Sequence, residues 1–186
     1  MTRDRRALGP DTRPSPMRYE LHGVVSGPEV AEFLTERSSH VRPVLLDGAE
    51  LVLVPMCPEL AADIDLDGPP LDPADDFELL SRWMTAVLTA ASRHGPVVYL
   101  ETEYTGGVGW QSAVVWLDCH VVLGPDVLES GDPFPAVTEP GRGGSPIVRA
   151  LRYLGVEAVG RHDEFVALGL GRFRSTEQWC AAWSAR

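Results

Sequence analysis

Two carboxylates on one predicted strand are the first residues that could do chemistry. Glu101 and Glu103 stand two positions apart in the segment YLETEYT, residues 99–105. Alternate side chains of a strand share a face, which places such a pair about 6–7 Å apart. Hydrolases that use paired carboxylates work at a similar separation. A solvated acidic face explains the pattern with fewer assumptions, and it is the interpretation that we favour.

A histidine beside two carboxylates is the second catalytic candidate. The segment RHDEF contains His162, Asp163 and Glu164, and such groups can act as general acid and base. Ser112 and Ser145 are the available nucleophiles. The chain has no G-x-S-x-G nucleophile elbow, however, and Ser145 is better explained as a helix cap. We therefore assign no catalytic residue.

Three glycines, Gly106, Gly107 and Gly109, form a stretch that could cradle a phosphate. A phosphate-binding glycine loop leads into a helix, whose N-terminal amides hold the anion. The residues that follow here, WQSAVVW, are β-branched and aromatic and predict a strand instead. We therefore expect a hairpin turn in which glycine supplies positive φ angles.

The basic residues exclude two further chemistries. All 16 are arginine, and the chain has neither lysine nor asparagine, a bias typical of high-GC bacterial genomes. A Walker A loop needs its lysine to reach the phosphates, and a pyridoxal-phosphate enzyme needs a lysine for its Schiff base. We expect no cofactor.

We expect no metal site either. The segment DIDLDG, residues 63–68, matches the opening of a calcium-binding loop, but its twelfth position is Ala74, where that loop has a bidentate glutamate. The cysteines Cys57, Cys119 and Cys180 are far apart and follow no metal-ligand spacing. We interpret them as unpaired apolar residues in a reducing compartment.

Charge is unevenly distributed along the chain, whose net charge is −11. Ten carboxylates and no basic residue lie between Arg42 and Arg82. A nucleic-acid-binding protein normally carries a basic patch, so we expect no nucleic acid as a partner. The acidic run instead predicts a surface for a basic protein, because complementary charge speeds association. The predicted partner-binding residues are Asp63, Asp65, Asp67, Asp72, Asp75 and Asp76.

The elements that must position these residues follow from apolar spacing and turn signals. Strands are expected at 17–25, on both sides of Asp47-Gly48, and three times between 96 and 124. Helices are expected from Pro28, from Asp75 to Gly95, after the cap Ser145, and after a capping box formed by Ser175 and Gln178. A loop is expected over 57–74.

This order of elements predicts an α+β fold. Short turns between strands indicate an antiparallel or mixed sheet of about six strands, with helices packed mainly on one face. Residues 1–16 have no periodic apolar face and are expected to be a disordered tail, so that residues 17–186 form a single domain.

Three segments in the second half carry distinctive motifs: YLETEYTGGVGWQSAVVW, IVRALRYLGV and DEFVALGLGRFRS. Their acidic strand, Gly-Gly-x-Gly turn and late DEF…GLGR segment resemble a family of small, largely uncharacterised bacterial proteins. We associate that family with immunity-type proteins encoded beside toxins. The resemblance covers about residues 97–175. It implies a functional surface that comprises Glu101, Glu103, Tyr104, Gln111, Asp163 and Glu164.

These observations predict a non-enzymatic binding protein, of the immunity type, that neutralises a basic toxin through an acidic surface. No apolar run approaches the roughly 18 residues of a membrane helix, and no signal-peptide h-region is present, so we expect a cytoplasmic protein without a membrane partner. Two other classes stay open. One is a small hydrolase that uses Glu101 and Glu103 or the His162–Glu164 cluster, and the other is a small-molecule sensor.

Overall fold

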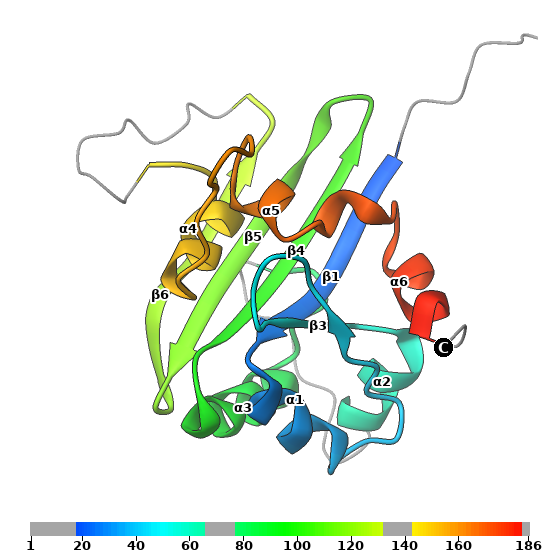
Figure 1. The fold of residues 1–186 in the computed structure, drawn as a ribbon. Coiled ribbons are helices and arrows are strands. Elements are labelled where there is room, and N and C mark those ends of the chain that lie inside the picture. The colour runs from blue at the N-terminus through cyan, green and yellow to red at the C-terminus, as the bar shows by residue number, and fades with distance from the viewer. Residues whose placement is uncertain (1–17, 66–76, 132–142, 184–186) are drawn as a thin grey trace, which may run out of the picture.

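The computed structural model describes residues 18–65, 77–131 and 143–183. Its centre is a six-stranded sheet in the order β2-β3-β1-β4-β5-β6, in which every neighbouring pair is antiparallel (Figure 1). The strands are β1 (Arg18–Ser26), β2 (Val44–Leu45), β3 (Val52–Pro55), β4 (Val97–Thr105), β5 (Val108–Leu117) and β6 (His120–Glu129). The predicted α+β fold with a sheet of about six strands is confirmed. The predicted tail at 1–16 lies outside the described residues.

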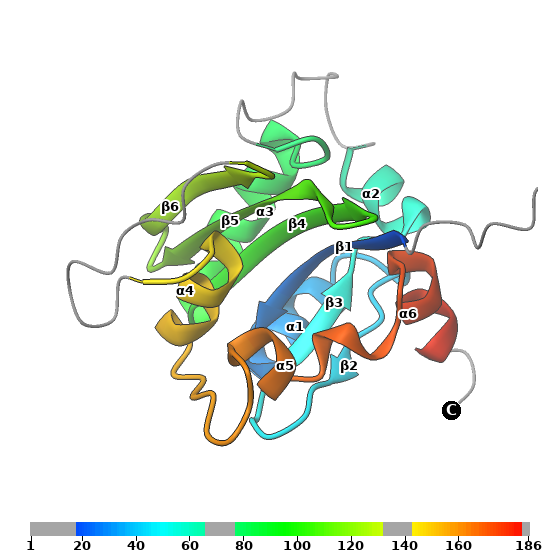
Figure 2. The same ribbon diagram turned by 90° about the horizontal axis from the view of Figure 1, so that it is seen from above.

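Helices cover both faces of the sheet, so the expectation that they pack mainly on one face is wrong. The helices of the described residues are α1 (Pro28–Thr35), α2 (Pro58–Asp65), α3 (Arg82–Ala91), α4 (Pro146–Tyr153), α5 (Glu164–Ala167) and α6 (Thr176–Trp183), with short 3₁₀ turns η1 (Ser92–His94) and η2 (Leu170–Arg172). Seen from above, α2 and α3 lie on one side of the strands, and α4 and α5 lie on the other (Figure 2). The reason lies in β4, where every residue from Val97 to Leu100 is fully buried. A strand with consecutive apolar residues needs cover on both faces.

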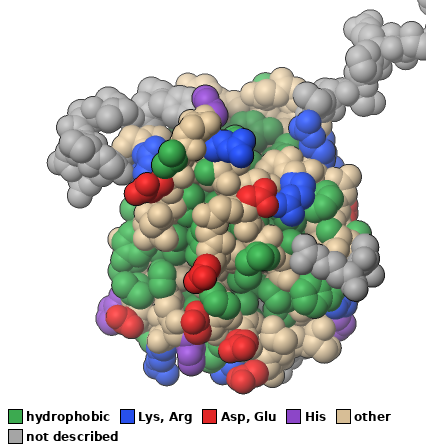
Figure 3. Space-filling model, in the orientation of Figure 1, with side chains coloured by type: hydrophobic (Ala, Val, Ile, Leu, Met, Phe, Trp, Pro, Cys, Tyr) green, Lys and Arg blue, Asp and Glu red, His purple; other side chains and the backbone are tan. Residues whose placement is uncertain are grey.

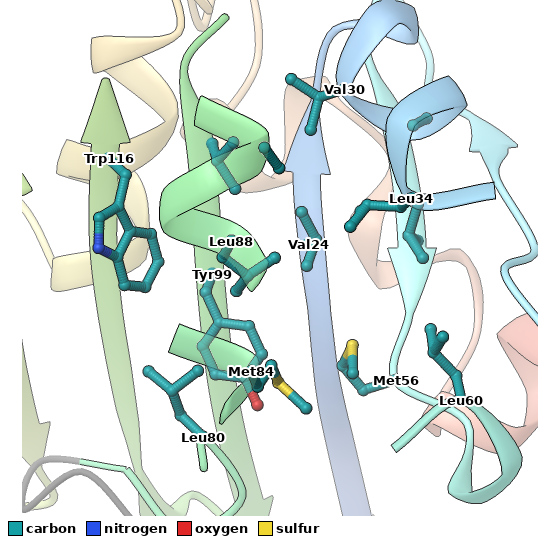
Figure 4. Close-up of a cluster of buried hydrophobic side chains, with 14 of the residues drawn as sticks. Val24, Val30, Leu34, Met56, Leu60, Leu80, Met84, Leu88, Tyr99 and Trp116 are labelled. Carbon is teal, nitrogen blue, oxygen red and sulfur yellow. The ribbon is translucent and has the colours of Figure 1, made fainter. Parts of the chain in front are cut away.

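Each face of the sheet has its own hydrophobic core. Beneath α1, α2 and α3, the side chains of Met84 and Leu88 pack against Tyr99 on β4 (Figure 4). On the opposite face, Leu151 from α4 and Trp179 from α6 are fully buried against the sheet. The two cores hold the long central strands between two helical layers.

The glycine stretch forms a hairpin turn, as predicted. Gly106 and Gly107 are the two residues between β4 and β5, and their φ angles are 62° and 87°. A two-residue turn of this kind requires positive φ at both positions. Gly109 serves a different purpose, because a Cβ atom there would lie only 1.8 Å from the carbonyl oxygen of Glu103.

Replacing Gly107 by valine should lower the free energy of unfolding by about 1–2 kcal/mol, because a side chain is strained in the left-handed region. Gly109→Ala should cost more, since the backbone of β4 blocks the new methyl group. Val108→Ala is the matched control, because this side chain is 69% exposed and should contribute little. Urea denaturation measures all three variants. A Gly107 variant as stable as the control would contradict the turn.

The predicted caps of two late helices are confirmed. Ser145 accepts a hydrogen bond from the backbone N–H of Val148 at the start of α4, and Gly155 follows that helix with a φ of 80°. Before α6, the N–H of Gln178 donates to the hydroxyl of Ser175 at 3.3 Å. Each cap depends on residues that are close in sequence, which is why both caps could be predicted from the sequence alone.

The segment between β3 and β4 differs from the prediction. The region predicted as a loop from residue 57 contains α2, and Pro58 suits its first helical position. The helix predicted from residue 75 begins only at Arg82, where the Ser81 hydroxyl accepts from the N–H of Met84 at 3.1 Å. Phe77 and Leu80 lie before this helix, although both are buried.

Two of the cysteines form a disulfide, so the expectation that all three are unpaired is wrong. Cys57 and Cys180 are separated by 123 residues in sequence and by 6.3 Å between their Cα atoms. The bond joins the start of α2 to α6. Cys119 is the free cysteine among the described residues. Pairing at such a distance in sequence leaves no spacing pattern to recognise.

Removing the disulfide should destabilise the fold, because it closes a long loop in the unfolded chain. We expect Cys57→Ser combined with Cys180→Ser to lower the free energy of unfolding by about 2–4 kcal/mol. Cys119→Ser is the control and should have a much smaller effect. Thermal unfolding with and without a reductant measures both, and a double variant as stable as the oxidised protein would refute the bond.

Candidate functional site

A pocket of about 470 Å³, called here the acidic pocket, lies at the end of the sheet where β1 begins. Strands β1 and β4, helix α2, residues 78–79 and the start of α6 surround it. Its carboxylates are Glu20, Glu78, Glu103 and Glu177. Its apolar walls are Met56, Pro58, Ala61, Leu79 and Met84. The remaining lining residues are Arg18, His22 and Thr176.

The adjacent carboxylates of Glu20 and Glu103 share one guanidinium. The two residues stand directly opposite each other on β1 and β4, and like charges at such positions destabilise a sheet. Arg18 offsets this repulsion, because its Nη2 lies 2.8 Å from Glu20 Oε2 and 3.2 Å from Glu103 Oε1. The side chain of Arg18 is 61% exposed, so its ion pairs contribute little to stability.

His22 places an unsatisfied polar atom beside the same pocket. The residue is only 8% exposed, and its Nε2 has no hydrogen-bond partner within the described ranges. Its Nδ1 lies 3.7 Å from Glu20 Oε1, which is beyond hydrogen-bond length. The backbone N–H of His22 donates to the hydroxyl of Thr176 at 2.9 Å, which fixes α6 against β1. A buried nitrogen without a partner costs about 1–3 kcal/mol.

Glu101 lies beneath the pocket and is fully buried. It stands opposite His22 across β1 and β4. Its carboxylate accepts hydrogen bonds from the N–H groups of Glu78 at 2.8 Å and Leu79 at 3.0 Å, and from the hydroxyl of Tyr99 at 2.7 Å. These bonds hold residues 78–79 outside the helix, which explains why α3 begins late. An attacking carboxylate needs access to its substrate, and Glu101 has none.

Glu101 and Glu103 should therefore respond differently to the same change. Glu101→Gln should lower the free energy of unfolding by about 1.5–3 kcal/mol, because the amide replaces a charged acceptor of backbone N–H groups. Glu103→Gln, at a side chain that is 36% exposed, should change it by less than about 1 kcal/mol. Urea denaturation measures the free energy of unfolding of both variants. Equal stability of the two variants would show that Glu101 does not hold residues 78–79.

The residues that the family resemblance indicated fall on opposite faces of the sheet. Tyr104, Gln111 and Asp163 line a pocket of about 190 Å³ on the face covered by α4 and α5. Gln111 Nε2 donates to the Tyr104 hydroxyl at 3.1 Å, and Gln111 Oε1 accepts from the N–H of Ile147 at 3.4 Å. Asp163 caps α5 by accepting from the N–H of Val166 at 2.9 Å. Gln111 and Asp163 are thus engaged in hydrogen bonds within the fold, Gln111 to Tyr104 and to the start of α4, and Asp163 to α5.

The His162–Glu164 cluster does not converge on one point. Glu164 is buried and forms a bidentate ion pair with Arg152. Arg152 Nε lies 2.6 Å from Glu164 Oε1, and Arg152 Nη2 lies 3.2 Å from Glu164 Oε2. The side chain of His162 is 88% exposed, and its Nε2 lies 4.0 Å from the carboxylate of Asp163. The pair between Arg152 and Glu164 joins α4 to α5, which is a structural role.

The predicted partner-binding aspartates are only partly described. Asp63 accepts hydrogen bonds from the Ser38 hydroxyl at 2.5 Å and from His40 Nδ1 at 2.8 Å. The hydrogen bond from Ser38 lowers the pKa of Asp63 most, and the hydrogen bond from His40 lowers it further. Asp65 is the last residue of α2. The other four, Asp67, Asp72, Asp75 and Asp76, lie outside the described residues.

Stability should depend on pH through Asp63. A carboxyl whose pKa is lowered in the folded state stabilises the protein above its unfolded pKa, about 3.9, and loses that contribution as the pH falls through the folded value. We therefore expect Asp63→Asn to lower the melting temperature at pH 7, with a difference that shrinks toward zero below about pH 3.9. Glu59→Gln, an exposed position on α2, is the control. A difference independent of pH would contradict the bonds.

Sequence reasoning missed most of the acidic pocket. Arg18, Glu20 and His22 alternate on β1 and therefore share a face, which was a usable signal. Nothing in the sequence showed that this face meets Glu103, or that α6 brings Glu177 to it. The pocket joins residues from both ends of the described chain.

Comparison with protein-family models, with curated proteins and with solved structures gives no significant match. In the ranges that the structure describes, no helix has both the length and the apolar character to cross a membrane. Within the same ranges, no three His, Cys, Asp or Glu side chains are grouped so as to hold a metal ion.

Proposed function

We propose that the protein is a non-enzymatic binding protein that engages a basic protein through the acidic pocket, as an immunity protein engages its toxin. One observation carries the proposal: four carboxylates and one exposed arginine surround a pocket with apolar walls. Opposite charge across an interface steers encounter and sets specificity. The apolar walls supply contact area for a side chain that enters the pocket.

The charge of the whole chain supports the same partner class. The net charge of −11 attracts a basic protein over a distance and repels nucleic acid and anionic membrane surfaces. Figure 3 shows a further group of acidic side chains low on the molecule, in the region where Figure 1 draws α1. Glu29, Glu32 and Glu36 are exposed there, on α1 and at its end. These carboxylates add to the negative electrostatic field around the protein.

A small-molecule sensor is the second candidate. The volume of the acidic pocket, about 470 Å³, lies within the range of sites that hold small ligands. Its ligand would be a cation, because four carboxylates line the pocket. The two candidates differ in what the protein retains from a cell lysate, which is a macromolecule in the first case and a small cation in the second.

The proposal keeps the cytoplasmic location that the sequence predicts. Disulfides are rare in reducing compartments, so the disulfide between Cys57 and Cys180 weighs against this location. Rapid acid quenching of intact cells and alkylation of the thiols in denaturant, which exposes the buried Cys57, followed by mass spectrometry, tests this part separately. Complete protection of both cysteines from alkylation would place the protein in an oxidising compartment.

The main test is capture from a lysate of the native host at low salt, followed by binding kinetics with the purified partner. We expect a basic protein whose association slows as salt rises. Glu78→Gln combined with Glu177→Gln should slow association about fivefold or more. Glu29→Gln combined with Glu32→Gln removes the same charge from α1 and should have a small effect.

Two outcomes would contradict the proposed function. Equal slowing by both double variants would show that only net charge matters and that the acidic pocket is not the contact site. Failure to retain any basic protein at low salt would show that the partner is not a basic protein.

A further inference from the structure

We propose that the acidic pocket is a guanidinium site, which an arginine side chain of the partner enters by displacing Arg18. This inference rests on the proposed function and makes it specific, because it names the group that is recognised.

Arg18 shows that Glu20 and Glu103 accept a guanidinium between them. The two carboxylates project from opposite positions of β1 and β4, and one nitrogen of Arg18 lies within 3.2 Å of both. A planar guanidinium offers several N–H donors in a fixed fork, which suits two neighbouring carboxylates better than the point charge of lysine.

Arg18 is held weakly enough to be exchanged. Its side chain is 61% exposed, and exposed ion pairs add little to stability. Glu20 and Glu103 are less exposed, at 23% and 36% of their side-chain surface. The carboxylates thus lie closer to the sheet, whereas the arginine that pairs with them stands largely in solvent.

Several groups of the pocket are not used by Arg18. The carboxylates of Glu78 and Glu177 also line the pocket, and both residues are exposed. The buried Nε2 of His22 lacks a partner within the described residues. A guanidinium that enters more deeply has five N–H donors for such acceptors.

The apolar walls fit the rest of an arginine side chain. Met56 and Met84 are buried beside the pocket, and Leu79 is 49% exposed at its edge. Long basic side chains bury their methylene groups along apolar surface while the charged head finds its partners. Methionine adapts its shape to such a chain. The pocket thus offers hydrogen-bond acceptors for the guanidinium group and apolar contacts for the methylene chain.

The test uses nitrogen-15 NMR of the full chain with N-acetyl-arginine amide as the probe. We expect shifts that saturate at millimolar concentrations, centred on the amides of Leu79 and Glu103. The citrulline analogue has the same shape without the charge and should cause no such shifts. The lysine analogue should bind at least about threefold more weakly than arginine, because its ammonium is more strongly hydrated and offers three N–H donors where a guanidinium offers five.

Three variants at the pocket and one control on α1 locate the site. Glu103→Gln should weaken arginine binding about fivefold or more, because it removes one charged acceptor. Arg18→Ala should strengthen binding, because it removes the internal competitor. Glu32→Gln on α1 is the control and should leave binding unchanged. Glu177→Gln repeats the first test from a different element of the pocket.

The outcomes separate this inference from the proposed function. Absence of saturable shifts, equal binding of citrulline, or weaker binding in Arg18→Ala would overturn the guanidinium site. If Glu103→Gln abolishes arginine binding but leaves the affinity of the captured protein unchanged, the inference is wrong while the proposed function stands. If arginine amide binds as expected and no basic protein is retained, the proposed function fails and the guanidinium site remains.

Discussion

The buried carboxylate of Glu101 is the interaction on which the acidic end of the molecule depends. It is fully buried in the middle strands and accepts three hydrogen bonds, two of them from the backbone of Glu78 and Leu79. A carboxylate in such a position must have its acceptors filled, because an unpaired buried charge is far more costly than a paired one. The chain therefore runs past Glu101 in a non-helical conformation. That path brings Glu78 and Leu79 to the wall of the pocket.

The charged residues of β1 and β4 gather at this same end of the sheet. Farther along β4, residues 97–100 are apolar and covered on both faces. Toward Thr105 the strand instead presents Glu101 and Glu103, and β1 presents Glu20 and His22 opposite them. The disulfide and the bond from His22 to Thr176 hold α6 beside this region. A rigid apolar frame thus ends in a charged and partly open pocket, as expected for a binding site on a stable scaffold.

Features set by neighbouring residues could be predicted from the sequence. The turn at Gly106 and Gly107, the hairpin at Asp47-Gly48 and the cap at Ser145 depend on a few adjacent residues. Features set by distant residues could not. The late start of α3 depends on Glu101, and the disulfide joins cysteines that are 123 residues apart.

The candidate site shows the same division between local and distant causes. The sequence predicted acidic binding, singled out Glu103, and predicted a binding surface at the aspartates between Arg42 and Arg82, most of which lie outside the described residues. In the structure, the carboxylate of Asp63 is engaged by Ser38 and His40. The acidic pocket also draws on Glu20 and Glu177, whose separate places in the sequence gave no sign that they line one pocket.

The most direct measurement is a crystal structure of the protein grown with N-acetyl-arginine amide. We expect a guanidinium group between Glu20 and Glu103, its methylene chain against Leu79, and Arg18 turned out into solvent. A structure in which Arg18 still bridges the two carboxylates, with the arginine amide absent from the pocket at saturating concentration, would contradict this expectation.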